Sequence, residues 1–252
     1  MQIELLPLVI AAAFFCELVD STLGMGYGTT LTPILLLAGY APADVVPAIL
    51  LSEFVTGVLA GIFHHEFGNV DFRPGSRDFK VMLVMAVLSV IGVLVAVVVA
   101  LNVPAWVLKL YVGLLVLSIG LTILRNHNHE TTFSWKRIGG LGLLAAFNKG
   151  MSGGGYGPVV TGGQVLSGIN GRSAIGIASL AEGLTSAVGF GAFMLGGEMF
   201  PWTLAPSLLL GAVLSTPLAA YVVSRVETKR LALAIGSFST VLGSYTLIKL
   251  VL

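Results

Sequence analysis

The amino-acid sequence predicts an all-α integral membrane protein with two inverted-topology repeats, each a glycine-tipped hairpin of short helices followed by three long transmembrane helices. Three observations predict this fold: an apolar composition, a repeated glycine motif and a one-sided distribution of lysine and arginine. Of the 252 residues, 56% are hydrophobic and 10% are charged, a composition typical of chains with long membrane spans. The formal net charge is +1 and the chain contains no basic block, which argues against nucleic acid as a partner.

A glycine motif occurs twice in the chain, first as GMGYG and later as GGGYG. A shift of 129 residues aligns residues 24–63 with residues 153–192 without a gap, and ten of these forty pairs are identical. Self-similarity at a fixed spacing indicates an internal repeat. We therefore divide the chain into a first repeat, residues 1–126, and a second, inverted repeat, residues 127–252.

Each repeat contains the same order of apolar segments: two short segments flank the glycine motif, and three long segments follow. The predicted short segments cover residues 3–20, 29–40, 137–149 and 158–168, and the predicted long segments cover residues 43–67, 78–101, 104–124, 172–195, 201–223 and 229–251. A helix needs about 20 residues to cross a bilayer. The long segments reach that length, whereas the second short segment of each pair covers about half of it. The short segments are therefore expected to form half-helices.

The positive-inside rule decides whether each short pair crosses the membrane once or turns back as a hairpin. If the pairs turn back, ten cationic residues fall on one side of the membrane, and only Lys109 and Lys249 fall on the other. The ten are Arg73, Arg77, Lys80, Arg125, Lys136, Arg137, Arg172, Arg225, Lys229 and Arg230. If the pairs cross, the same residues divide almost evenly, so the hairpin is favoured. The repeats are then inverted, the cationic loops face the cytoplasm, and both termini lie outside the plasma (inner) membrane.

The glycine motifs place non-helical backbone at membrane depth, where it is tolerated only inside protein or beside a polar cavity. One hairpin enters from each side, so the two tips are expected to approach each other near the midplane, where transporters bind their substrates. Glycine lets the backbone approach a ligand closely, and each following half-helix directs its positive N-terminus toward the tip, which favours an anion. The predicted substrate-binding residues of the tips are Gly26, Tyr27, Gly28, Thr29, Thr30, Gly154, Gly155, Tyr156 and Gly157, with Thr161 as a further hydroxyl donor. The alternative is that the glycines only permit close helix crossing.

Lys149 completes the predicted substrate-binding set. It lies four residues before the second glycine motif, and Asp20 is its counterpart in the first repeat. A lysine at this depth can neutralise a bound anion. It can also form a structural ion pair with Asp20 or Glu17, and the sequence leaves both roles open.

Glu53 and Glu182 occupy equivalent positions in the two repeats, each three residues before a threonine and therefore on the same helix face as that threonine. In one interpretation, each carboxylate accepts hydrogen bonds from amides of the glycine loop and supports the hairpin. In the other, each carboxylate binds and releases a proton during transport. The sequence favours neither interpretation.

His64, His65 and Glu66 form the sequence HHE at the predicted inner boundary. Adjacent helical residues point to different faces and no second His/Cys cluster is nearby, so we expect a solvated helix end rather than a metal site. The chain has no zinc motif such as HExxH and no Ser/His/Asp set, so no catalytic residue, metal or cofactor is predicted.

The glycine tips and the segments that follow them resemble the TauE/SafE sulfite-exporter family of membrane permeases. The resemblance rests on the tips GMGYGTTLTP and GGGYGPVVT, the turns AGYAPADVV and SGINGRSAI, and the acidic spans LSEFVTG and LAEGLTS, and it covers nearly the whole chain. It implies transport of a small sulfur-containing anion such as sulfite, thiosulfate, sulfoacetate or a related organosulfonate across the plasma membrane. The first tip has Met25 where the second has Gly154, so the two half-sites are expected to bind differently.

The predicted function is therefore a secondary transporter in the lipid bilayer that moves the anion by alternating access, with or without coupled protons, as a monomer or a homo-oligomer. Two other classes are alternatives. An intramembrane enzyme of sulfur metabolism would need a nucleophile or metal set that the sequence does not display. An ion channel is suggested by GYG, but the Thr-Val lead-in of the potassium filter is absent, and two inverted copies cannot align their carbonyls on one axis.

Overall fold

The computed structural model is all-helical over the residues that it describes, which are 5–100, 105–126, 132–152, 156–195 and 203–251. Within these ranges, the description leaves out the side chains of residues 42, 43, 93–100, 105, 108, 109, 126, 146–152, 156 and 251. The helices are α1 (Pro7–Leu23), α2 (Tyr27–Leu37), α3 (Pro42–Glu66), α4 (Arg77–Ala100), α5 (Ala105–Asn126), α6 (Trp135–Ser152), α7 (Tyr156–Leu166), α8 (Gly171–Leu195), α9 (Ala205–Arg225) and α10 (Thr228–Val251).

These helices lie where the apolar segments predict them. α2 and α7 have 11 residues each, about half the length that a bilayer requires. By length and composition, four stretches of the described residues can cross a membrane: Asp44–Glu66, Gly171–Leu195, Ala205–Arg225 and Thr228–Leu250. The chain therefore has the helices of a multi-pass membrane protein.

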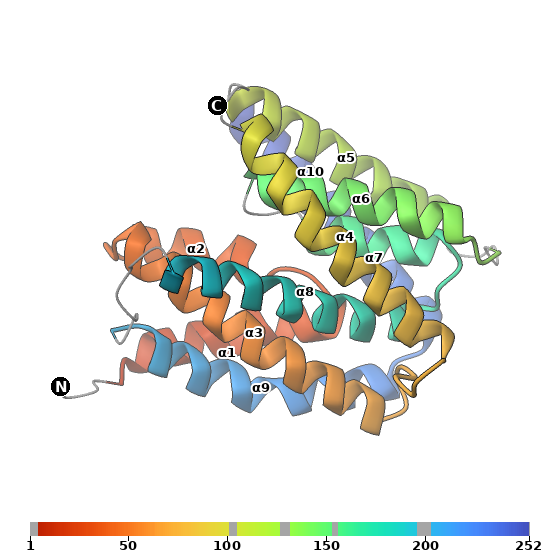
Figure 1. The fold of residues 1–252 in the computed structure, drawn as a ribbon, viewed down its shortest axis with the longest axis horizontal. Coiled ribbons are helices and arrows are strands. Elements are labelled where there is room, and N and C mark those ends of the chain that lie inside the picture. Colours follow the sequence, from red (N-terminus) through yellow and green to blue (C-terminus); the bar gives the residue numbers. More distant parts are fainter. Residues whose placement is uncertain (1–4, 101–104, 127–131, 153–155, 196–202, 252) are drawn as a thin grey trace.

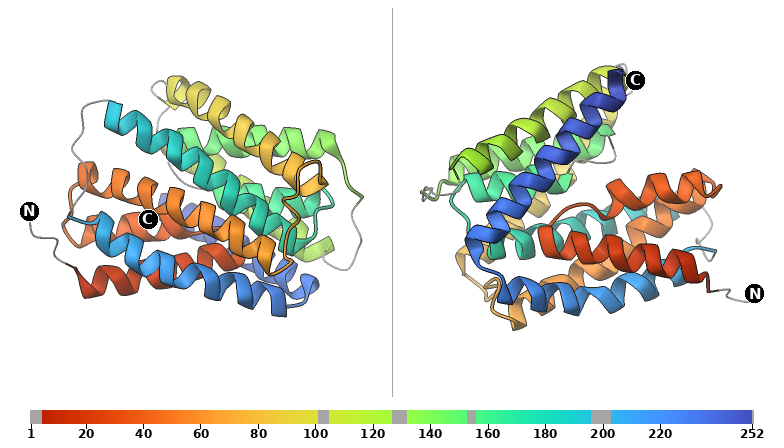
Figure 2. Two further views of the ribbon diagram at one scale, coloured as in Figure 1. Left: turned by 60° about the horizontal axis from the view of Figure 1, so that its bottom comes forward. Right: turned by 180° about the vertical axis from the view of Figure 1, so that it is seen from behind.

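The first short pair forms a hairpin. α1 and α2 pack against each other and run in opposite directions, as Figure 1 and the rear view in Figure 2 both show. The turn contains Gly24 with φ +71° and Gly26 with φ +127°, values that side chains of L-residues rarely adopt. These two glycines thus permit the reversal. α6 and α7 also pack against each other, and the turn that joins them lies outside the described residues.

α3 and α8 cross at the centre of the molecule (Figure 1). A Cβ placed on Gly57 would lie 2.6 Å from the Cα of Gly183, so the absence of both side chains lets the two backbones touch. α8 also packs against α4 and α7. It therefore joins the group formed by α1, α2, α3 and α9 to the group formed by α4, α5, α6, α7 and α10.

Several helix contacts occur in matching pairs. α1 packs against α9 as α6 packs against α4, and α3 packs against α9 as α8 packs against α4. The match is incomplete, because the paired helices α5 and α10 pack against α7, whereas α2 packs mainly against α1 and α3.

The ten cationic residues that the sequence analysis assigned to one side of the membrane gather at one end of the molecule. This cationic end comprises the α3–α4 loop, the C-termini of α5 and α9 and the N-termini of α4, α6, α8 and α10, at the right of Figure 1. Trp135 lies at this end and Trp106 near the other, and their side chains are 47% and 59% exposed. Exposed tryptophans near helix ends are typical of membrane interfaces.

Candidate substrate site

The two hairpins meet where α7 begins. The Thr161 hydroxyl donates to the backbone oxygen of Gly24 at 2.7 Å. Gly157 lies so close to the first tip that an added Cβ would be 2.6 Å from the Cα of Met25 and 2.8 Å from the oxygen of Gly24. The first turn of α7 therefore contacts the first tip, and the absence of a side chain at Gly157 makes this contact possible.

Polar groups at the first tip bond mainly to the protein itself. The Tyr27 backbone N–H donates to the Asp20 carboxylate at 3.1 Å, and the Tyr27 hydroxyl bonds to Ser52 Oγ at 2.8 Å. Tyr27 is 1% exposed. The Thr29 hydroxyl donates to the oxygen of Gly26 at 3.2 Å, and the Thr30 side chain is exposed. The Asp20 carboxylate thus accepts a hydrogen bond from one of the backbone N–H groups at the start of α2 that have no partner within the helix.

Four carboxyl groups gather beside this tip. Glu17 and Asp20 of α1, Glu53 of α3 and Glu182 of α8 line a small pocket together with Thr56, Gly57 and Ser179. Its volume is about 10 Å³, room for one water-sized group. Glu17 and Asp20 are only 2% and 9% exposed. The two sequence-predicted glutamates therefore lie in one site, close to the crossing of α3 and α8.

Glu53 lies against the start of α2. A Cβ placed on Gly28 would be 2.7 Å from Glu53 Oε1, and the Ser186 hydroxyl donates to Glu53 Oε2 at 2.8 Å. Under the 129-residue shift, Ser186 corresponds to Gly57, which has no hydroxyl to offer Glu182. The hydroxyl partner of Glu53 therefore has a glycine as its counterpart in the other repeat.

Sequence reasoning did not place Glu17 in this site. Glu17 Oε1 accepts a hydrogen bond from the Ser21 hydroxyl at 2.5 Å, and Glu17 Oε2 accepts one from the Thr56 hydroxyl at 3.2 Å. The available signal was the spacing of Glu17, Asp20 and Ser21, which places three polar side chains on one face of an otherwise apolar helix. Such a face needs a polar neighbour inside a membrane protein.

The expectation of a solvated helix end is wrong for His64, which is 0% exposed. α8 covers this end of α3, since a Cβ on Gly176 of α8 would lie 3.2 Å from the His64 Cβ. Only the next two residues match the expectation in part, since His65 is half-buried and Glu66 is exposed. His64 is therefore part of the interior.

The hydrogen bonds of His64 fix its tautomer. The Asn69 side-chain Nδ2 lies 2.8 Å from the backbone oxygen of Ala220 and 3.0 Å from His64 Nδ1. A backbone oxygen only accepts, so the amide nitrogen must face it, and His64 Nδ1 is then the acceptor of the second amide hydrogen. The remaining ring hydrogen is on Nε2, which donates to the backbone oxygen of Ser21 at 3.0 Å. A neutral histidine thus ties the end of α1 to Asn69 and, through it, to α9.

Part of the predicted site lies outside the described residues. This holds for Gly154, Gly155 and the side chains of Lys149 and Tyr156. Gly157 is described and buried. Among the described residues, no group of three or more His, Cys, Asp or Glu is arranged to hold a metal ion.

Gln164 of α7 is a buried polar residue that sequence reasoning missed. It is 0% exposed, and neither atom of its amide has a hydrogen-bond partner among the described residues. Its counterpart in α2 is Leu35, which is buried in the apolar core. The amide therefore occupies a place where the other half of the chain has a hydrocarbon side chain.

Comparison with known proteins gives a family match and a similar protein. Residues 9–246 match the family model described as sulfite exporter TauE/SafE. A Bacillus subtilis (strain 168) protein described as a probable membrane transporter, YtnM, is 29% identical over 247 residues, which cover 92% of this chain and 79% of that protein. No solved structure matches the chain.

Proposed function

The chain belongs to the TauE/SafE sulfite exporter family of membrane transporters, and we propose that it is a secondary transporter. It moves a small sulfur-containing anion across the plasma membrane by alternating access. The substrate class comprises sulfite, thiosulfate, sulfoacetate and related organosulfonates. The cationic end faces the cytoplasm and both termini lie outside, in accordance with the positive-inside rule.

The observation that carries the proposal is the contact between the two glycine-tipped hairpins. The first turn of α7 lies against Gly24 and Met25, with Thr161 bonded to Gly24. Two half-helices that begin beside the same point direct positive N-termini toward it. This is the arrangement in which transporters with inverted repeats hold anionic substrates.

The matching helix pairs support inverted repeats over residues 1–126 and 127–252. α1 with α9 corresponds to α6 with α4, and α5 pairs with its own counterpart, α10. The α5–α10 pair packs against α7 rather than α2. In alternating access, the opposite state exchanges such unequal contacts between the repeats. We therefore infer that α5 and α10 move relative to the two hairpins during the cycle.

The carboxyl pocket supports transport of the anion together with protons. Four ionised carboxylates in one small, buried pocket would repel one another and would repel an anion at the neighbouring tip. A proton fits a pocket with room for one water-sized group and supplies the missing positive charge. Glu53 and Glu182 are the proposed coupling residues, with Glu17 and Asp20 beside them, and Lys149 is the proposed fixed charge.

Counterflow in proteoliposomes tests this function. Vesicles containing the purified protein are preloaded with unlabelled sulfite, thiosulfate or sulfoacetate, and uptake of the labelled anion is followed. A transporter gives transient accumulation that saturates, whereas a channel gives none and an enzyme alters the label chemically. Gly28→Val, whose side chain would collide with Glu53, serves as the inactive control because Gly28 is at the proposed site. Absence of counterflow for every sulfur anion would refute the proposal.

A further inference from the structure

A second polar cavity lies at the cationic end, apart from the pocket at the glycine tips. Its volume is about 560 Å³. Its lining comes from three connections of the chain, between α3 and α4, between α7 and α8, and between α9 and α10, and includes Arg73, Arg172, His65, Asn170, Ser173 and Thr228. A cavity of this size accommodates a small ligand.

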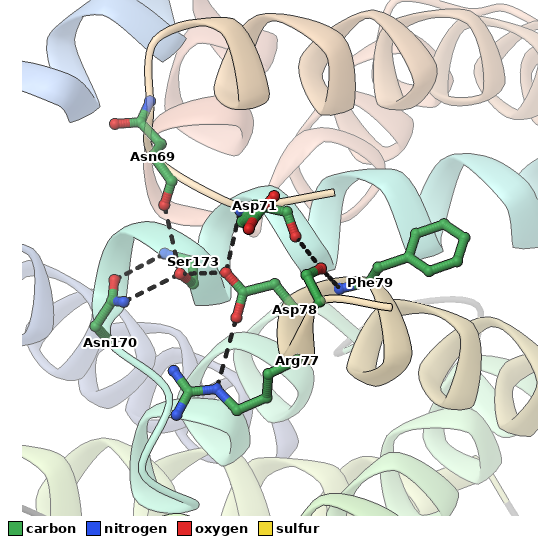
Figure 3. A network of polar contacts seen from close by, with 8 residues as sticks. Asn69, Asp71, Arg77, Asp78, Phe79, Asn170 and Ser173 are labelled. Carbon is green, nitrogen blue, oxygen red and sulfur yellow. Dashed lines mark hydrogen bonds and ion pairs between the residues drawn. The ribbon is translucent and has the colours of Figure 1, made fainter. Parts of the chain in front are cut away.

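Hydrogen bonds between the connections hold the wall of the cavity in place (Figure 3). Asn170 Oδ1 accepts from the Ser173 backbone N–H at 2.9 Å, which caps α8. The Ser173 hydroxyl donates to Asp78 Oδ2 at 2.8 Å, and the same oxygen accepts from the Asp71 backbone N–H at 3.2 Å. The starts of α4 and α8 are thereby fixed to each other and to the α3–α4 loop.

Two arginines, Arg73 and Arg172, line the cavity together with two aspartates, Asp71 and Asp78, and a third arginine, Arg77, lies beside Asp78. Arg73 lies 3.7 Å from Asp71, and Arg77 lies 3.8 Å from Asp78, so each aspartate has a cationic neighbour. Arg172 has no carboxylate partner among the described residues. Its guanidinium donates instead to the backbone oxygen of Val226, at 3.2 Å from Nε and 2.8 Å from Nη2. A neutral carbonyl orients this half-buried guanidinium but leaves its charge uncompensated.

Helix orientation adds to this charge. α4, α8 and α10 all begin at the cavity, since Asp78, Arg172 and Thr228 stand in their first turns and line it. Each N-terminus carries a partial positive charge of about half a unit. Asp78 already offsets this charge at the start of α4, so Arg172 and the starts of α8 and α10 are the groups that favour a small anion.

The combination of a capping asparagine and an arginine at the start of α8 occurs in only one half of the chain. Under the 129-residue shift, Asn170, Arg172 and Ser173 correspond to Ala41, Ala43 and Asp44 at the start of α3. The capping asparagine and the arginine therefore have no equivalent at the other end of the molecule. The positive-inside rule accounts for a cation on this side of a membrane, but not for a guanidinium fixed by two hydrogen bonds in the wall of a cavity.

We propose that this cavity is a second anion site, which binds a tetrahedral oxyanion such as sulfate or phosphate at the cationic end through Arg172, Arg73 and the start of α8. The site is separate from the proposed substrate site at the glycine tips, and its existence does not depend on which anion the protein transports.

Thermal unfolding of the purified, full-length protein in detergent tests the proposal, with inorganic sulfate as the probe and chloride replaced so that ionic strength stays constant. Sulfate should raise Tm along a saturating curve, and Arg172→Gln should raise the apparent Kd at least tenfold. Arg172→Lys should retain part of the affinity, because lysine keeps the charge but cannot donate the two hydrogen bonds that the guanidinium makes to the Val226 backbone oxygen. Arg73→Gln, at an exposed position, should weaken binding without lowering the basal Tm.

Arg137→Gln is the matched control, because Arg137 also lies at the cationic end and donates to a backbone oxygen, that of Leu166 at 2.9 Å, but does not line the cavity. Its sulfate curve should equal that of the unmodified protein. Gly28→Val separates the two sites and should leave the sulfate response intact even where transport is lost. Equal curves for Arg172→Gln, Arg73→Gln and Arg137→Gln, loss of the response in Gly28→Val alone, or an equal response to chloride would each overturn the proposal.

Discussion

The Thr161 hydroxyl of α7 donates a hydrogen bond of 2.7 Å to the backbone oxygen of Gly24, at the C-terminal end of α1. The two residues are separated by 137 positions in the sequence. Gly24 leaves room for this bond, since a Cβ there would lie 2.5 Å from Thr161 Oγ1. One side chain therefore connects α7 to the first hairpin at the proposed substrate site.

Replacement of Thr161 should loosen this connection. Thr161→Val keeps the shape but removes the donor, which should lower the free energy of unfolding by about 0.5–1.5 kcal/mol and reduce counterflow. Thr161→Ser keeps the hydroxyl and should restore most of the transport. Unfolding and counterflow of the two variants in parallel check this expectation. If Thr161→Val transports as Thr161→Ser does, the hydrogen bond has no part in the cycle.

Replacement of His64 should destabilise the protein, and the loss of stability should be smaller when the new side chain retains more of the hydrogen bonds. His64→Leu leaves the Ser21 oxygen and one Asn69 amide hydrogen without partners in the interior, which should cost about 1–3 kcal/mol for each unsatisfied group. His64→Gln can still donate to the Ser21 oxygen and should cost less. Glu66→Gln, exposed on the same helix, is the control. Thermal unfolding in detergent ranks the three, and a His64→Leu variant as stable as the control would contradict the tautomer argument.

Helix positions could be predicted from the sequence because apolar length directly reports how far a segment can extend in a membrane. Shift symmetry likewise predicted that Glu53 and Glu182 would occupy matching places. The inclusion of Glu17 and the burial of His64 could not be predicted in this way. Both depend on how α1 and α8 pack across α3. The residues that correspond to Glu17 and His64 in the second repeat are the apolar Ala146 and Phe193, so the repeat did not indicate a functional role for either residue. Gln164 was missed for the same reason, since its counterpart is Leu35.

Neutralising Glu53 should separate the two roles proposed for it. Glu53→Gln keeps an acceptor for the Ser186 hydroxyl, so the hairpin keeps its support. If Glu53 carries the coupled proton, this variant should lose accumulation driven by a pH gradient but retain counterflow at equal pH on both sides. Glu182→Gln should behave alike, and Glu227→Gln, an exposed glutamate paired with Arg230 at 3.2 Å, is the control. Retention of pH-driven accumulation in both variants would leave the carboxylates with a supporting role only.

Replacement of Gln164 tests whether its buried amide contacts the substrate or only destabilises the folded protein. Gln164→Leu copies the residue that the first repeat has at this place. Removal of an unsatisfied buried amide should raise the free energy of unfolding by about 1–3 kcal/mol. If the amide only destabilises the folded protein, counterflow in the variant should be unchanged. A stabilised variant with a raised KM for one sulfur anion would instead assign Gln164 to the substrate path.

Lys149 is expected to supply the fixed positive charge of the substrate site. An anion that leaves water for a cavity at membrane depth loses hydration that helix N-termini of about half a charge do not fully replace. Lys149→Met should therefore weaken anion affinity strongly, whereas Lys149→Arg should retain part of it.

If Lys149 instead forms a structural pair with Asp20, the pattern differs. Lys149→Met then lowers thermal stability, and the double variant with Asp20→Asn restores both folding and transport. The double variant is a clean test because asparagine retains an oxygen that can accept the Tyr27 backbone N–H, which Asp20 now accepts at 3.1 Å. The neutral pair therefore keeps the turn of the first hairpin while it removes both charges. Measurement of substrate affinity and Tm for the two single variants and the double variant decides the role: affinity that stays weak in the double variant places Lys149 at the substrate, and recovered transport assigns it to the scaffold.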